Sequence, residues 1–309
     1  MKYKLHHFGI VSQDMDKSLA MYLDQLGQTL TSRWYNREQL NIAFLGKGSG
    51  VTLEIVGKPH LDYEQVHIAK HGYSINHLSF LVEDADHAFS ELMREGVRVA
   101  WEPFSMDDIL GMRQCAFYDE DGLLFEVFSY PRGKTMSTPD TKTPPGPTEL
   151  SLDHVSILTP DLRRAQRFYM EKLDLKPLLE YTEDEGGFIF LTDSTFDPHT
   201  NNFMLEIIGP PHLEPREQVL LEKRGVCFDH LCFSAEDVHA AWKTLLEKGV
   251  QKIADPVYEY GLWMGWLKDP DGIEVEIMSP IPAEILTNAL KGGQVPNLVK
   301  TKWKQTSFV

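Results

Sequence analysis

Two kinds of metal-binding side chain alternate along this chain, histidine then glutamate, four times. The gaps between them are 47, 23 and 49 residues in the first half of the chain and 52, 24 and 46 in the second. Imidazole nitrogens and carboxylate oxygens are ligands for divalent transition metals, and four on an octahedral ion leave two positions open for substrate oxygens or water. We therefore interpret all eight as metal ligands: His7, Glu54, His77, Glu126, His154, Glu206, His230 and Glu276.

Each of these residues lies in a stretch that is typical of a β-strand. In "VTLEI", alternation places Val51, Leu53 and Ile55 on one face and Glu54 on the other. His7 has the same setting, opposite Phe8. A lone carboxylate is costly to bury. The polar faces are therefore expected to look into a solvated cavity or onto a partner charge.

The strands belong to an internal duplication. "LEIVGKPHL" (53–61) returns as "LEIIGPPHL" (205–213), identical at seven of nine positions, and "YDEDGLLFEVFS" (118–129) returns as "KDPDGIEVEIMS" (268–279). The repeats predict a first module at 1–133, a Pro-rich linker at 134–149, a second module at 150–282 and a tail at 283–309. Indels in loops explain why the offset drifts by a few residues.

Each module divides again into two similar units. A strand that carries the histidine is followed by an aspartate and an amphipathic helix, and then by two or three strands of which the last contains the glutamate. The capping aspartates are Asp14, Asp84, Asp161 and Asp237. Glycine ends three of the helices. Asp174 stands where the first unit has Gly27, which predicts that the third helix ends differently.

Composition narrows the possible partners. The net charge of −16 argues against nucleic acid and anionic membranes. No apolar run reaches about 18 residues, and the first residues do not resemble a signal peptide. Three cysteines in apolar contexts do not form a disulfide framework, so we expect a cytoplasmic protein.

At "HFGIVSQDMDKSLAMY", "TLEIVG", "NHLSFLVEDADHAF" and "DEDGLLFEVF", and at their second copies, the sequence resembles the vicinal oxygen chelate superfamily. This superfamily includes glyoxalase I, methylmalonyl-CoA epimerase and extradiol dioxygenases. The resemblance implies an α+β fold of four βαβββ units, in which two units pair into a cup around one metal. It also implies one or two divalent ions per chain (Co, Ni, Zn, Mn or Fe(II)) and a small-molecule substrate with vicinal oxygens.

Three functions follow from the resemblance. The first is an isomerase, epimerase or lyase that moves an α-proton through a metal-bound enediolate, with Glu126 or Glu276 as the base. The second is an Fe(II) extradiol-type dioxygenase that uses His154, His230 and Glu276. The third is a ligand-binding protein of the bleomycin-resistance kind, which the eight intact candidate ligands disfavour.

The sequence leaves the arrangement of the modules open. Each module can close its own cup, or the two can share their sites as swapped glyoxalase dimers do. We expect self-contained modules, although the linker is long enough for either arrangement. A homodimer is also possible.

Overall fold

The computed structural model describes residues 3–36, 40–46, 51–57, 75–106, 111–130, 150–183, 186–193, 204–210, 228–259 and 261–280. The predicted linker at 134–149 lies outside these ranges, as does the tail at 283–309. The boundaries of the two modules therefore stay predictions.

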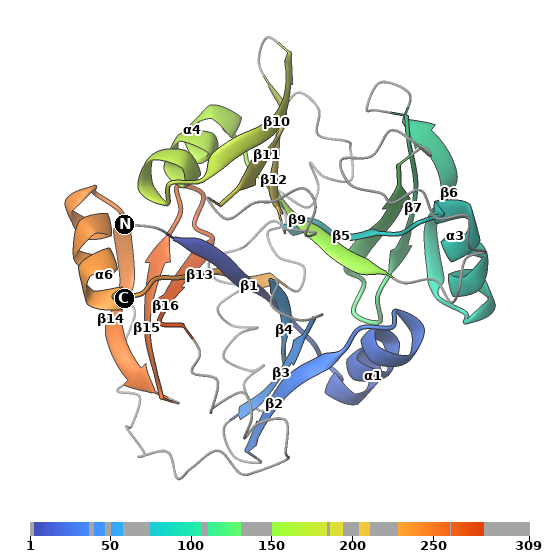
Figure 1. Cartoon of the computed structure of the whole chain (residues 1–309), viewed down its shortest axis with the longest axis horizontal. Helices are drawn as coiled ribbons and strands as arrows, with labels where there is room; N and C mark the ends of the chain where they lie inside the picture. Colours follow the sequence, from blue (N-terminus) through green and yellow to red (C-terminus); the bar gives the residue numbers. More distant parts are fainter. Residues whose placement is uncertain are drawn as a thin grey trace.

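Over the described residues, the chain folds into four units of one strand, one helix and three strands, which confirms the predicted α+β class (Figure 1). The first unit comprises β1 (Lys4–Val11), α1 (Met15–Ala20) with a π-helical turn η1 (Met21–Gln25), β2 (Leu30–Asn36), β3 (Leu40–Leu45) and β4 (Thr52–Val56). The second comprises β5 (Ile75–Leu81), α3 (Ala85–Arg94), β6 (Arg98–Met106), β7 (Met112–Tyr118) and β8 (Leu124–Ser129).

The second half of the chain repeats this order. The third unit comprises β9 (Ser151–Leu158), α4 (Leu162–Arg167) with a π-helical turn η2 (Phe168–Lys172), β10 (Lys176–Glu183), β11 (Gly186–Thr192) and β12 (Met204–Gly209). The fourth comprises β13 (Phe228–Ser234), α6 (Val238–Glu247), β14 (Gln251–Glu259), β15 (Leu262–Lys268) and β16 (Glu274–Met278).

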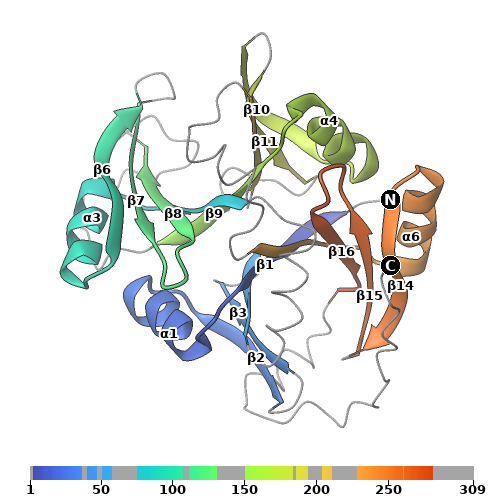
Figure 2. The same cartoon turned by 180° about the vertical axis from the view of Figure 1, so that it is seen from behind.

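The strands form two eight-stranded sheets, and each sheet takes one unit from each sequence repeat. Sheet A has the order β14-β15-β16-β13-β1-β4-β3-β2, and sheet B has the order β10-β11-β12-β9-β5-β8-β7-β6. β1 lies antiparallel to β13, and β5 antiparallel to β9, as the two opposite views show (Figures 1 and 2). The expectation that each module closes its own cup is therefore wrong.

The predicted helix caps are present. The side chains of Asp14, Asp84, Asp161 and Asp237 each accept a hydrogen bond from the backbone N–H three residues later. Asp174 has a φ of 59°, close to the 61° of Gly27 at the equivalent position. The third helix therefore ends in the same left-handed turn as the first, contrary to our expectation. Aspartate tolerates this conformation better than most residues, and its carboxylate pairs with Lys176.

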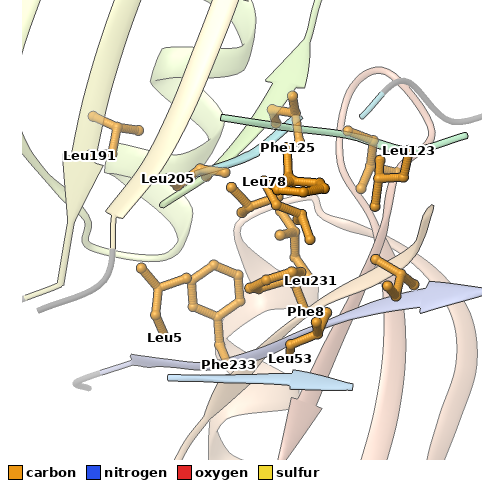
Figure 3. Close-up of a cluster of buried hydrophobic side chains, with 14 of the residues drawn as sticks. Leu5, Phe8, Leu53, Leu78, Leu123, Phe125, Leu191, Leu205, Leu231 and Phe233 are labelled. Carbon is orange, nitrogen blue, oxygen red and sulfur yellow. The ribbon is translucent and has the colours of Figure 1, made fainter. Parts of the chain in front are cut away.

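The apolar faces of both sheets contribute to one buried core (Figure 3). Phe8, Leu53 and Leu231 come from sheet A, and Leu78 and Phe125 come from sheet B, and all five are almost fully buried. Burying a side chain of this size stabilises a fold by about 1.5–3 kcal/mol. The shared core fixes the two sheets relative to each other and leaves their polar faces for a site.

The two units of each repeat are also joined by buried hydrogen bonds. The Tyr22 hydroxyl donates to Asp119 at 3.1 Å, and at the equivalent place the Tyr169 hydroxyl donates to Asp269 at 2.9 Å. Each unit is thus bound to the other repeat through a sheet and to its own repeat through side chains. No helix among the described residues is long and apolar enough to cross a membrane.

Candidate metal centres

Four of the candidate ligands meet in sheet A, two from the first repeat and two from the second. In sheet A, β1 and β13 lie side by side and are flanked by β4 and β16, so His7, His230, Glu54 and Glu276 converge; we name this group centre A. The His7 Nε2 atom lies 2.8 Å from Nε2 of His230, 3.0 Å from Oε2 of Glu54 and 3.3 Å from Oε2 of Glu276. The His230 Nε2 atom lies 3.2 and 3.3 Å from the same two carboxylate oxygens.

The other four residues form an equivalent group in sheet B, which we name centre B. The His77 Nε2 atom lies 3.2 Å from Nε2 of His154 and 3.3 Å from Oε2 of both Glu126 and Glu206. The His154 Nε2 atom lies 3.7 Å from Oε2 of Glu206. All eight sequence-predicted residues are therefore brought together, but each centre takes two from each repeat.

The three-residue set expected for a dioxygenase does not assemble as predicted. His154 lies in centre B, whereas His230 and Glu276 lie in centre A. Two histidines and one glutamate do meet in each centre. These groups are His7, His230 and Glu276, and His77, His154 and Glu206.

Burial and charge act against each other in centre A. Burial pushes the pKa of Glu54 upward, but His7 and His230 beside it outweigh that effect and hold the pKa below its usual value. Burial likewise lowers the pKa of His7, but Glu54 and Glu276 more than compensate and the pKa is raised. The pKa of Glu276 is well below its usual value, because hydrogen bonds from His230 and His7 outweigh burial. The centre therefore favours bound positive charge.

The two centres differ at their last-strand glutamates. Glu126 is 14% exposed, compared with 6% for Glu276. The residue paired with Glu126 on the neighbouring strand is Ala116, whereas Trp266 is paired with Glu276. A small neighbour covers less of the carboxylate, so centre B is the more open of the two at this position.

A β-bulge precedes the first candidate ligand histidine of each sequence repeat, and alternation in the sequence did not reveal it. Leu5 and His7 are paired with the adjacent residues Phe233 and Cys232, so His6 is the extra residue in β1. In β9, Asp153 is the extra residue in the same way. A bulge re-aims a side chain. The His6 Nδ1 atom consequently lies 2.8 Å from Nδ1 of His7, and an Asp153 oxygen lies 2.8 Å from Nδ1 of His154.

These two contacts orient the rings. Asp153 accepts a hydrogen bond from Nδ1 of His154, so that Nε2 directs its lone pair toward the rest of centre B, as a metal ligand requires. In centre A the same place is taken by an imidazole, and burial together with His7 lowers the pKa of His6 to about 4. The signal for both residues was the position directly before a ligand histidine.

The family model described as the Glyoxalase/Bleomycin resistance protein/Dioxygenase superfamily matches residues 4–127 and 151–277. The chain therefore belongs to this superfamily, which confirms the resemblance to vicinal oxygen chelate proteins. The two matched segments correspond to the two sequence repeats.

Individual proteins resemble this chain over most of its length, in sequence or in fold. The chain is 23% identical over 312 aligned positions to lactoylglutathione lyase of Schizosaccharomyces pombe, covering 89% of this chain and 96% of that protein. Its fold is similar to glyoxalase I from Zea mays, with a TM-score of 0.67 at 18% identity over 94% of this chain and 95% of that one. A putative dioxygenase from Bacillus subtilis gives a TM-score of 0.63 at 13% identity, covering 93% of this chain and 90% of that one.

Proposed function

We propose that this protein is a metal-dependent isomerase, epimerase or lyase that moves a proton at the carbon next to a carbonyl group. Its substrate is a small molecule with vicinal oxygens. The observation that supports the proposal best is the composition of the centres, since each gathers two imidazoles and two carboxylates. The relative named lactoylglutathione lyase also supports a lyase.

The residues fit a divalent ion. Metal–ligand bonds of about 2.0–2.2 Å at right angles place neighbouring donor atoms about 3 Å apart. In centre A the separations are 2.8–3.3 Å. Two carboxylates buried beside two imidazoles also need positive charge, and a divalent cation supplies it. We therefore assign His7, Glu54, His230 and Glu276 to one ion and His77, Glu126, His154 and Glu206 to a second.

A bound divalent ion would supply Lewis-acid polarisation of the two substrate oxygens. The remaining work belongs to the chain. Glu126 in centre B and Glu276 in centre A would take the α-proton on a carboxylate oxygen and return it to the neighbouring carbon or to the other face. The histidines hold these carboxylates in position through the contacts described above.

The alternative is an extradiol-type dioxygenase, which needs two histidines and one carboxylate. The compact groups of His7, His230 and Glu276, and of His77, His154 and Glu206, favour this candidate. Against it stands the fourth ligand of each centre. Glu54 contacts both histidines of centre A, and Glu126 contacts His77 of centre B, although a ring-cleaving enzyme does not need either.

Two parallel assays separate the candidates. The chain is loaded with Co²⁺, Ni²⁺, Zn²⁺, Mn²⁺ or Fe²⁺ and offered 2-oxoaldehyde hemithioacetals, 2-methyl-branched acyl-CoA esters and catechols. NMR in D2O follows exchange or transfer of the α-hydrogen, and an oxygen electrode follows oxygen uptake. We expect proton transfer without oxygen uptake. Stoichiometric oxygen consumption with ring opening would overturn the proposal, and substrate binding without turnover would indicate a ligand-binding protein.

A further inference from the structure

A second cluster of metal-binding atoms lies beside centre A and includes a sulfur. One ring nitrogen of His6, one of His7 and the Sγ atom of Cys232 all lie within 4.8 Å of one another. The bulge at His6 turns its ring toward His7, and Cys232 is paired directly with His7 across β1 and β13. His7 and Cys232 are buried and His6 is half-buried. We call these three residues the sulfur trio.

The same three positions exist in sheet B with different chemistry. Asp153 is the bulge residue, His154 follows it, and Ser79 is paired with His154. The donors there are a carboxylate, an imidazole and a hydroxyl. The Ser79 hydroxyl is fully buried and has no hydrogen-bond partner among the described residues. One backbone geometry therefore carries two nitrogens and a sulfur in sheet A, and one nitrogen and two oxygens in sheet B.

We propose that the sulfur trio is a binding site for a thiophilic divalent cation, such as Cd²⁺ or Zn²⁺, and that sheet B has no equivalent. Thiolate and imidazole are the ligands that these ions prefer. Metal–sulfur bonds of about 2.3 Å and metal–nitrogen bonds of about 2.0–2.1 Å at tetrahedral angles put sulfur and nitrogen about 3.5 Å apart. The donor atoms of the sulfur trio all lie within 4.8 Å of one another in the structure. On binding, the Sγ–H bond of Cys232 breaks, a sulfur–metal bond forms, and the proton passes to solvent without any electron transfer.

Cadmium alone tests the site, because its bond to a thiolate gives an ultraviolet charge-transfer absorption that cadmium on oxygen or nitrogen does not. The reduced, metal-free full chain is titrated with Cd²⁺. We expect one sulfur-bound equivalent per chain and its loss in Cys232→Ser. Cys115→Ser and Cys227→Ser are the matched controls and should keep the signal. The Cys115 thiol donates to the carbonyls of Ala85 and Val127, away from the sulfur trio.

Two further variants use the difference between the sheets. His6→Asp copies Asp153 into sheet A, keeps every cysteine and should weaken cadmium binding about 10-fold or more. Asp153→His combined with Ser79→Cys builds the trio in sheet B and should add a second sulfur-bound equivalent. His6→Asp also tests the site if Cys232→Ser fails to fold, which circular dichroism would reveal.

The proposal is overturned if the absorption persists in folded Cys232→Ser, disappears in Cys227→Ser, or is unaffected by His6→Asp. His7 belongs both to the sulfur trio and to centre A, but these outcomes are measured on sulfur-bound cadmium alone and so do not test the proposed function. Binding of Mn²⁺, measured separately by equilibrium dialysis, tests the oxygen- and nitrogen-based centres. A chain that binds Mn²⁺ but shows no sulfur-bound cadmium would retain the function and lose this inference.

Discussion

The Nε2 atoms of His7 and His230 lie 2.8 Å apart, although 223 residues separate them in the chain. The distance joins the first strand of the first repeat to the first strand of the last unit. His77 and His154 meet in the same way in the other sheet, at 3.2 Å. Each centre is therefore a product of both repeats.

Pairs of histidine substitutions test this arrangement. His7→Ala with His230→Ala removes two ligands from centre A and none from centre B, so the chain should retain about one divalent ion. His7→Ala with His77→Ala removes one ligand from each centre and should lose most of both ions. Metal content after reconstitution and gel filtration measures the difference. Self-contained modules predict the reverse pattern, so that result would contradict the arrangement of the sheets.

The glutamates of β8 and β16 are expected to act as bases. Glu126→Gln with Glu276→Gln keeps an oxygen that can hold the metal but cannot accept the proton. The rate should fall on the order of 10²-fold or more while much of the metal is retained. Each single variant should keep part of the activity from the unaltered centre. Steady-state kinetics with parallel metal analysis checks both statements, and an unimpaired double variant would exclude these residues as bases.

The buried aspartates between the units predict a pH dependence of stability. Burial raises the pKa of Asp119 to about 6 and that of Asp269 to about 7, despite hydrogen bonds from tyrosine and backbone groups. Their folded pKa values lie above the ordinary value of 3.8, so the stabilisation is complete below about pH 4 and is lost progressively as the pH rises from there through the folded values of about 6 and about 7. The free energy of unfolding should fall by up to about 1.4 kcal/mol per pH unit for each group within that window.

Asp269→Asn is the informative variant. Its oxygen can still accept the backbone N–H groups of Asp271 and Ile273, and its amide can donate to the hydroxyl of Tyr169. Because it does not titrate, urea unfolding between pH 4 and pH 8 should show a flatter profile than the wild type between about pH 4 and pH 7. Asp119→Asn should flatten the profile between about pH 4 and pH 6. Unchanged profiles in both variants would mean that other groups set the pH dependence.

Metal should stabilise the fold. A ligand that binds only the native state at 100 times its dissociation constant adds about 2.7 kcal/mol to the free energy of unfolding. Addition of the preferred ion should therefore raise the melting temperature, and a chelator should lower it. Differential scanning fluorimetry measures the shift. The variant that combines His7→Ala with His77→Ala should respond much less, and an equal response would place the stabilising ion elsewhere.

Asp153 should strengthen metal binding in centre B through His154. Its carboxylate fixes the ring and its tautomer, and loss of such a partner commonly costs 10- to 100-fold in affinity. Asp153→Ala should weaken one of the two sites by about that factor in calorimetric titration, while Asp153→Asn, which keeps an accepting oxygen, should have a smaller effect. Two unaltered sites in Asp153→Ala would exclude this role.

Much of the fold follows from local pattern. Alternation identifies the strand faces at Glu54 and Phe8, and aspartate caps locate the helices, because both signals depend on neighbours within a few residues. Asp174 shows the limit of such reasoning. Its left-handed φ depends on the turn that it must close and not on residue type alone.

The sequence by itself determined the kinds of candidate ligand, their eight strand settings and the resemblance to the superfamily. Only the tertiary structure decided which candidate ligands meet in one centre. The four units carry nearly the same pattern, so the sequence alone does not distinguish pairing of β1 with β5 from pairing of β1 with β13. The pairing partner of β1 depends on how the two sheets bury one core. Pairing then fixes the register, and the register produces the bulges that turn His6 and Asp153 toward the centres. The strand pairs β1–β13 and β5–β9 join segments far apart in the chain, so a pattern along the sequence does not reveal them.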